Sequence, residues 1–224
     1  MIVPAAGRGS RLKSKTPKPF VQVLGKPLFI HTLSALKNAY SFYEFVLAVD
    51  PDRILEAGDW VRRFNFGNVQ IVPGGNTRAE SVKLALEATS DKNGWVVVHD
   101  AARPLVSAQV VRQALKGAKK TGASVVAMPA HATVKRVQKQ SLMVGCTENR
   151  EELYLAQTPQ VFRRDLLLAR YRALGKKAFD RTDDAALFDG SSVKVQVVPG
   201  EAKNIKITTA EDMELFKYYL KKDS

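Results

Sequence analysis

The sequence predicts an α/β fold, a doubly wound sheet, because short β-rich runs alternate along the chain with segments of helical period. The expected strands are residues 2–4, 45–49, 69–72, 95–99, 124–128 and 193–198. Runs such as "WVVVH" (95–99) are apolar throughout, as strands covered on both faces must be. Alternation of this kind places helices on both sides of a mostly parallel sheet.

Four segments between the strands carry apolar residues at spacings of three and four, which is typical of helices packed on a sheet. They are residues 27–39, 53–64, 78–88 and 107–120. In the third helix we expect Val82, Leu86 and either Leu84 or Ala85 to face the core. Each of these helices would lie in the connection between two consecutive strands.

The chain closes with a fifth expected helix, "TTAEDMELFKYYLKK" (208–222). Thr208 and Glu211 have the spacing of a capping box at its start. Met213, Phe216 and Leu220 form an apolar stripe along it. We therefore expect this helix to pack on the body of the protein through that stripe.

Residues 131–162, "HATVKRVQKQSLMVGCTENREELYLAQTPQVF", interrupt the alternation, because they show no helical period. The segment is too long for an ordinary connection, and such excursions are often functional. We expect residues 131–157 to form a β-hairpin arm projecting from a single domain of residues 1–224. A disordered insert is less favoured because the segment contains Val134, Val137, Leu142, Val144, Leu153, Tyr154 and Leu155.

The composition limits the partners and the compartment. The 35 Lys and Arg residues exceed the 22 Asp and Glu residues, and the net charge of +13 favours nucleic acid or small phosphorylated molecules as ligands. No apolar run approaches the roughly 20 residues that span a membrane. Cys146 is the only cysteine, so a reducing cytoplasm is the expected location. His31, His99 and His131 are too scattered to suggest a metal cluster, and we interpret them as structural.

The stretch "PAAGRGSRLKSKTPKPF" (4–20) follows the first strand with small residues and then cations. It lacks the third glycine of a dinucleotide fingerprint, where Leu12 stands, and the G-K-[ST] of a P-loop. Small residues let backbone N–H groups approach phosphates closely. Arg11 can fork onto phosphate oxygens, and flanking prolines restrict the backbone at Lys18. We therefore favour a phosphate-binding loop over a mobile basic terminus.

Six motifs occur in order along essentially the whole chain. The first is the opening stretch, which resembles the signature loop of sugar-nucleotide pyrophosphorylase-type nucleotidyltransferases. The others are "GGNTRAESV" (74–82), "VHDAARP" (98–104), "TENREELYLAQTPQVF" (147–162), "RTDDA" (181–185) and "NIKIT" (204–208). Together they resemble the 2-C-methyl-D-erythritol 4-phosphate cytidylyltransferase family. The resemblance implies a Rossmann-like mixed sheet of nucleotidyltransferase type. It also implies transfer of CMP from CTP to methylerythritol phosphate, with release of pyrophosphate, in isoprenoid precursor synthesis.

The resemblance also implies roles for individual residues. The catalytic positions are Arg11, Lys18, Arg150 and Lys206. The CTP-binding positions are Ala5, Ala6, Gly7, Gly75, Asn76, Ser81 and Asp100. The acceptor-binding positions are Asp100, Arg103, Thr133, Arg150, Thr158 and Thr182. A homodimer is implied in which the arm brings Thr133 and Arg150 to the partner's acceptor site. Mg²⁺ is expected to accompany the triphosphate, with Asp100 as the one candidate ligand and no firm protein site.

The residues suit that chemistry, because the attacking phosphate is already mostly ionised at neutral pH and needs no base. What remains is to position two anions and to stabilise charge with cations. Two positions depart from the family pattern: Pro19 stands where Gln is common, and Asn76 where Asp is frequent. The first strand is short, as a truncated start would make it. Arg8, Lys13 and Lys15 are interpreted as contributors to field and solubility.

Three alternatives remain open at this point. Ribitol 5-phosphate cytidylyltransferase performs the same chemistry on a related acceptor, although "PAAG", "HDAARP" and "RTDDA" fit it less well. A basic nucleic-acid-binding module predicts a continuous positive face with stacking aromatics. A non-catalytic dimeric scaffold is disfavoured by the presence of Arg11, Lys18 and Lys206.

Overall fold

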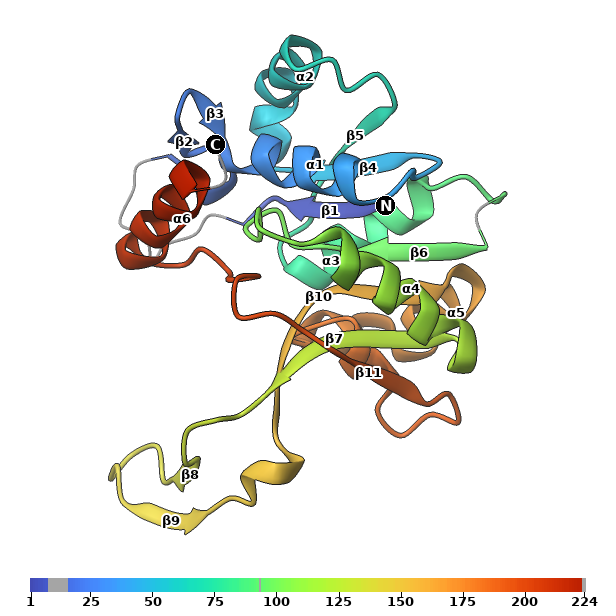
Figure 1. The fold of residues 1–224 in the computed structure, drawn as a ribbon. Coiled ribbons are helices and arrows are strands. Elements are labelled where there is room, and N and C mark those ends of the chain that lie inside the picture. Colours follow the sequence, from blue (N-terminus) through green and yellow to red (C-terminus); the bar gives the residue numbers. More distant parts are fainter. Residues whose placement is uncertain (8–15, 93, 223–224) are drawn as a thin grey trace.

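A computed structural model describes residues 1–7, 16–92 and 94–222, and one seven-stranded sheet runs through its middle (Figure 1). Its strands are β1 (Ile2–Ala5), β4 (Phe45–Val49), β5 (Val69–Pro73), β6 (Trp95–Val98), β7 (Ala123–Pro129), β10 (Tyr154–Arg163) and β11 (Val195–Pro199). Their order across the sheet is β11-β7-β10-β6-β1-β4-β5. All neighbours pair in parallel except β10, which is antiparallel to both β6 and β7. The predicted α/β fold with a mixed sheet is confirmed.

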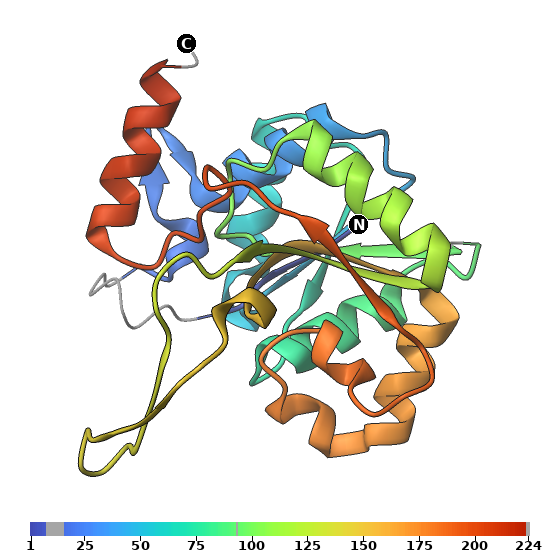
Figure 2. The ribbon, with the colours of Figure 1, turned by 60° about the horizontal axis from the view of Figure 1, so that its bottom comes forward.

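Helices cover both faces of the sheet. One face packs on α1 (Leu28–Ala39), α2 (Ile54–Arg63) and α4 (Ala108–Thr121) through a large cluster of buried apolar residues. The other face packs on α3 (Arg78–Ala88) and α5 (Arg164–Leu174). Figure 2 shows α4 and α5 on opposite sides of the strands. In α3, Val82, Ala85 and Leu86 are buried, whereas Leu84 faces solvent, so Ala85 takes the core position.

The C-terminal helix α6 (Ala210–Lys222) packs beside a small hairpin of β2 (Gln22–Val23) and β3 (Lys26–Pro27) (Figure 1). The expected stripe is present: Met213 and Phe216 are buried and Leu220 packs against the same small core. The expected capping box is wrong by one residue. The backbone N–H of Asp212 donates to Thr209 Oγ1, and Asp212 Oδ2 accepts from the Thr209 N–H. Thr209 and Asp212 therefore form the box, since Asp serves as well as Glu at that position.

The hairpin arm projects away from the sheet, as Figure 1 shows. Its strands β8 (Lys135–Val137) and β9 (Val144–Thr147) pair antiparallel. A short 3₁₀ turn, η4 (Arg150–Glu152), leads back to the sheet. Residues 154–157, which the sequence pattern assigns to the arm, belong to β10, and residues 154–156 pair with β7. From here "the arm" means residues 131–153.

Strand β10, like the helix α5 that follows it, is an element that the apolar pattern did not predict. It crosses the middle of the sheet, yet Gln157, Thr158 and Gln160 are buried polar residues, and Pro159 interrupts them. A proline argues against a central strand because it cannot donate to the ladder. The strand tolerates Pro159 because its register with β7 shifts between Ala156 and Gln160. This irregular stretch lies where the polar residues of the candidate site gather.

Candidate active site

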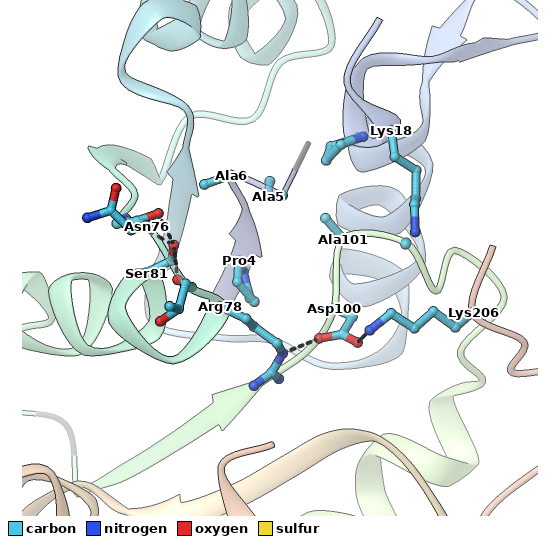
Figure 3. Close-up of a pocket in the computed structure, with 15 residues that line it drawn as sticks. Pro4, Ala5, Ala6, Lys18, Asn76, Arg78, Ser81, Asp100, Ala101 and Lys206 are labelled. Atoms are coloured by element: carbon cyan, nitrogen blue, oxygen red, sulfur yellow. Dashed lines mark hydrogen bonds and ion pairs between the residues drawn. The ribbon is translucent and has the colours of Figure 1, made fainter. Parts of the chain in front are cut away.

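Two neighbouring pockets lie where the carboxyl ends of β1 and β6 meet the amino end of α3. Figure 3 shows the first of them. Ligands of open α/β sheets gather at this edge. The first pocket is bordered by every described residue that the sequence assigned to CTP, together with Lys18 and Lys206. The second is bordered by Asp100, Arg103, Thr158 and Thr182. Both pockets share three wall residues, Arg78, Asp100 and Lys206.

Close packing beside the first pocket requires glycine at position 74. A Cβ at Gly74 would lie 2.4 Å from Ala6 Cβ and 3.1 Å from the Val49 carbonyl oxygen, which have little room to move. A Cβ at Gly75 would lie 2.2 Å from Glu80 Cγ, so the Glu80 side chain would have to shift. The two glycines bring the loop and the "PAA" end of β1 together as one wall of the pocket.

The amino end of α3 shapes the same wall. Thr77 caps the helix by accepting from the Glu80 N–H at 3.1 Å. Ser81 Oγ accepts from the Gly75 N–H at 3.0 Å and lies 2.9 Å from the Thr77 carbonyl oxygen. Ser81 therefore holds the glycine loop in place. The open start of a helix also favours anions, since unpaired N–H groups and the helix dipole point toward it.

Lys18 borders the first pocket from the other side, in the short turn η2 (Lys18–Phe20). Figure 3 shows its side chain across the pocket from Asn76 and Ser81. Pro19 stands in the first turn of η2, where its missing backbone N–H is not needed. Pro17 and Pro19 flank Lys18, which is largely buried. The departure at Pro19 is thus compatible with a fixed position for Lys18.

Asp100 lies at the centre of the shared wall, between two cations (Figure 3). Its Oδ1 accepts from Arg78 Nε at 2.9 Å, and its Oδ2 lies 2.7 Å from Lys206 Nζ. Burial opposes the charge on Asp100, but Arg78 and Lys206 hold the pKa of this carboxyl far below its usual range. The carboxylate is therefore ionised at any physiological pH.

A hydrogen-bonded chain behind Asp100 fixes its backbone. The Asp100 N–H donates to Thr158 Oγ1 at 3.1 Å, and that hydroxyl lies 3.0 Å from His99 Nδ1. His99 Nε2 lies 2.9 Å from the Arg103 carbonyl oxygen, which can only accept. The proton of the ring is thus on Nε2, and the Thr158 hydroxyl donates to Nδ1. Burial lowers the pKa of His99 to about 4, so the ring is neutral.

Arg103 is turned inward at the second pocket. Its Nη1 donates to the Asn204 carbonyl at 2.7 Å and its Nη2 to the Ala156 carbonyl at 3.4 Å. Burial lowers the pKa of Arg103, and Asp100 only partly offsets this effect. Thr182, by contrast, is exposed at the same pocket. Arg103 and Thr158 thus build the wall, and Thr182 presents a free surface.

Two of the described site residues, Thr133 and Arg150, are not brought to either pocket, and Arg11 lies outside the described residues. Thr133 and Arg150 are exposed on the arm and border neither pocket of their own chain. Arg150 Nη1 donates to the His131 carbonyl at 3.1 Å, within the arm itself.

The histidines differ in their surroundings. His31 Nε2 lies 2.9 Å from the Val23 carbonyl, and its ring meets Phe216 edge-on. His31 and His99 are therefore structural, as predicted, while His131 is exposed on the arm. Within the described part of the chain, no three His, Cys, Asp or Glu residues gather in a way that would hold a metal ion.

Sequence reasoning missed two members of the site, Arg78 and Asp184. Arg78 Nη1 lies 2.8 Å from Asp184 Oδ2, so one guanidinium joins two buried carboxylates. Both residues stand inside quoted motifs, "GGNTRAESV" and "RTDDA". The feature that could have identified them is that each is a charged residue inside a motif and had no role assigned to it.

Comparisons with known proteins agree with this geometry. Residues 1–222 match the sequence model of the 2-C-methyl-D-erythritol 4-phosphate cytidylyltransferase family. The chain is similar to enzymes of that name from Solibacter usitatus (38% identity, 100% of this chain and 96% of the relative) and Mannheimia succiniciproducens (38%, 98% and 94%). It also resembles the crystal structure of 4-diphosphocytidyl-2C-methyl-D-erythritol synthase from Anaerococcus prevotii, with a TM-score of 0.85, 32% identity, and coverage of 98% and 96%.

Proposed function

Because the chain belongs to the 2-C-methyl-D-erythritol 4-phosphate cytidylyltransferase family, we propose that its two pockets hold the two substrates of that reaction. The chain is a nucleotidyltransferase that transfers CMP from CTP to 2-C-methyl-D-erythritol 4-phosphate. The products are 4-diphosphocytidyl-2-C-methyl-D-erythritol and pyrophosphate, and the pathway is non-mevalonate isoprenoid precursor synthesis. Ribitol 5-phosphate cytidylyltransferase and a nucleic-acid-binding module are not favoured by the comparisons.

One observation carries the assignment of the pockets: they share the wall formed by Arg78, Asp100 and Lys206. In this proposal CTP occupies the first pocket, with its phosphates against the glycine loop and the start of α3. Methylerythritol phosphate occupies the second. The α-phosphate of CTP and the phosphate of the acceptor then meet at the shared wall, beside Lys206.

The reaction needs cations and alignment more than a base. An oxygen of the acceptor phosphate attacks the α-phosphorus, and the bond from that phosphorus to the bridging oxygen of the β-phosphate breaks. Pyrophosphate leaves with the electron pair. The attacking phosphate is mostly ionised at neutral pH, since its second pKa is about 6. His99, buried and neutral, is fully occupied by Thr158 and Arg103. Positioning and charge stabilisation supply the acceleration.

We assign charge stabilisation at the α-phosphate to Lys18, Lys206 and Arg11. Lys206 is the most accessible of the shared wall residues, with 38% of its side chain exposed. Its Nζ can move from Asp100 Oδ2 toward an incoming phosphate, because a lysine stem is flexible. Asp100 would then be free to accept from a hydroxyl of either substrate. Thr182 offers its exposed hydroxyl to the acceptor.

We propose that Mg²⁺ enters with the triphosphate and takes most of its ligands from phosphate oxygens and water. Support comes from the surroundings of Asp100, the carboxylate that borders both pockets. Both of its oxygens face cations, and so a divalent ion held there by the protein alone would be repelled. When bound, the ion supplies positive charge that offsets the charge of the phosphate chain.

We further propose that the enzyme works as a homodimer in which the arm completes the partner's acceptor site. The exposed Thr133 and Arg150 support this, since they border neither pocket of their own chain. A reducing cytoplasm is the proposed location, supported by a single cysteine. No helix in the described residues is long and apolar enough to cross a bilayer.

The test is a pyrophosphate-release assay that crosses the four nucleoside triphosphates with three acceptors: methylerythritol phosphate, ribitol 5-phosphate and a hexose 1-phosphate. We expect release with CTP and methylerythritol phosphate at a kcat/KM at least about tenfold above any other pair. Equal or greater release with ribitol 5-phosphate would reject methylerythritol phosphate as the acceptor.

A further inference from the structure

Arg78 connects the shared wall to Asp184 in the interior of the fold. Its Nε donates to Asp100 Oδ1 at 2.9 Å and its Nη1 to Asp184 Oδ2 at 2.8 Å. Its Nη2 is closed off from solvent and has no hydrogen-bond partner among the described residues. Nε and Nη1 are therefore engaged by carboxylates, and Nη2 is closed off, in this conformation.

Asp184 is an anchor behind the site, not a part of its surface. It is fully buried and borders neither pocket. Its Oδ1 lies 3.1 Å from the Tyr171 hydroxyl, and its backbone N–H donates to Gln160 Oε1 at 3.1 Å. Tyr171 and Gln160 come from α5 and β10, so two elements hold this residue in place. The carboxylate of Asp184 reaches the shared wall through Arg78.

The charges in this group favour a fixed arrangement. A buried carboxylate without a partner is expensive, and removing one member of a buried pair leaves such a charge behind. One planar guanidinium can hold two carboxylates at a set distance and orientation, which a lysine cannot. Burial lowers the pKa of Arg78, but Asp184 and Asp100 more than compensate and raise the pKa above its usual value.

We propose that Arg78, anchored by Asp184, is a positioning residue that fixes the Asp100 carboxylate between the two pockets and, through it, sets the resting place of Lys206 Nζ. The chain of contacts runs from Asp184 through Arg78 to Asp100, and from Asp100 to Lys206 at 2.7 Å. This inference rests on the roles proposed above for Asp100 and Lys206. Displacements of about 1 Å in such groups can cost about 10²-fold in rate.

The experiment compares Arg78→Gln and Asp184→Asn with a matched arginine away from the site. Arg164 is also largely buried, and it donates to Thr89 at 2.9 and 3.2 Å and pairs with Asp91 at 2.8 Å, yet it borders neither pocket. Steady-state kinetics give kcat and the KM for methylerythritol phosphate. Calorimetry gives the Kd of CTP, and thermal melts report folding.

For Arg78→Gln we expect kcat to fall about 10²-fold while the Kd of CTP stays within about threefold. The kcat of Asp184→Asn should also fall, although Asp184 touches no substrate. The double variant should lose little more than Arg78→Gln alone, because both changes break one chain of contacts. Arg164→Gln should lower the melting temperature without changing kcat. Arg78→Lys restores the charge but not the fork, and so should recover less than half of the lost free energy of activation.

Two outcomes would overturn the inference. If Arg78→Gln weakens CTP binding and leaves kcat intact, Arg78 is a direct ligand of the nucleotide. If Arg78→Gln and Asp184→Asn behave like Arg164→Gln, the group is merely structural. Should Arg78→Gln not fold, Arg78→Lys decides, since it keeps the buried charge. An inactive wild-type chain in the same assay would instead reject the proposed function itself.

Discussion

The Asp100 group and the arm both carry residues assigned to the acceptor site, yet their surroundings are opposite. Asp100 is buried, and hydrogen bonds or ion pairs join it to Arg78, Thr158 and Lys206. On the arm, Thr133 and Arg150 are exposed, and Arg150 donates to the His131 carbonyl of the arm itself. One region is organised before any ligand binds, and the other is not.

A single chain thus pairs and positions the charges of its two pockets by itself. Its arm carries site residues that do not reach those pockets. The arm exposes several large apolar residues for so small a hairpin, including Leu142, Met143 and Val144. Exposed apolar clusters of this kind mark contact surfaces. The homodimer proposed above accounts for both the apolar surface and the distant acceptor residues.

The largest effect is expected when a cation is removed from the finished region. Lys206→Ala should lower kcat about 10²- to 10³-fold, as loss of one preorganised group that stabilises transition-state charge does. Lys18→Ala should act similarly, and both proteins should remain folded. Lys217→Ala, in an exposed pair with Glu214 on α6, is the matched control and should be fully active. Pyrophosphate release measures all three. Near-wild-type release by Lys206→Ala would remove that lysine from the reaction.

A second contrast concerns stability. Phe162 on β10 is fully buried and stacks on Phe188 with ring centroids 5.3 Å apart. Phe162→Ala should lower the free energy of unfolding by about 3–5 kcal/mol, because it removes a large core side chain and leaves a cavity. Lys139→Ala, in the exposed turn of the arm, should change it by less than about 0.5 kcal/mol. Denaturant unfolding checks both. Similar losses would mean that the arm is part of the folded core.

Much of the sheet and of its helices could be predicted from the sequence, because the residue patterns that indicate them are local. Alternating apolar runs indicated the parallel strands and their helices, and the small residues at the end of β1 indicated part of the first pocket's wall. Strand β10 escaped because Gln157, Thr158 and Pro159 break the apolar pattern that central strands usually show. Tertiary pairing buries those polar groups, and no local rule foresees it.

The ion pairs escaped for the same reason. Arg78 and Asp184 are 106 residues apart in sequence, and only the packing of α3 against the segment around Asp184 brings them together. The arm's strands could be predicted from their apolar residues, but the residues that it would face could not. The spacing of residues along one sequence does not reveal which of them would contact another chain.

A drop in pH should distinguish the buried region from the arm through the effect of their histidines, His99 and His131, on stability. The folded protein holds His99 neutral, with burial lowering its pKa to about 4, whereas in the unfolded chain the pKa returns to about 6.5. Between these values the unfolded state binds the extra proton, so stability falls as pH drops from about 6.5 to 4. The loss from His99 approaches 3 kcal/mol, or ~2.3RT for each pH unit crossed. Carboxylates with lowered pKa values add their losses only below about pH 4.

The measurement is the free energy of unfolding at pH 7 and pH 4.5. His99→Gln should be less stable than wild type at pH 7 but should lose less on acidification. His131→Gln, on the exposed arm, should keep the wild-type pH dependence. Equal slopes for wild type and His99→Gln would show that this buried ring does not control the acid sensitivity.

The smallest expected change in activity tests whether the arm completes the acceptor site of its own chain or that of the partner. Lys206→Ala damages the buried part of the site, and Arg150→Ala damages the arm. Each variant alone should lose at least about tenfold in turnover.

In a mixed dimer, an arm that serves the partner leaves one site with both defects and the other with none. Equal mixing makes half of the dimers mixed, so about a quarter of all sites are intact. Activity should therefore return to within a factor of about four of wild type after subunit exchange. If each arm served its own chain, no mixed dimer would contain an intact site, and mixing would restore nothing.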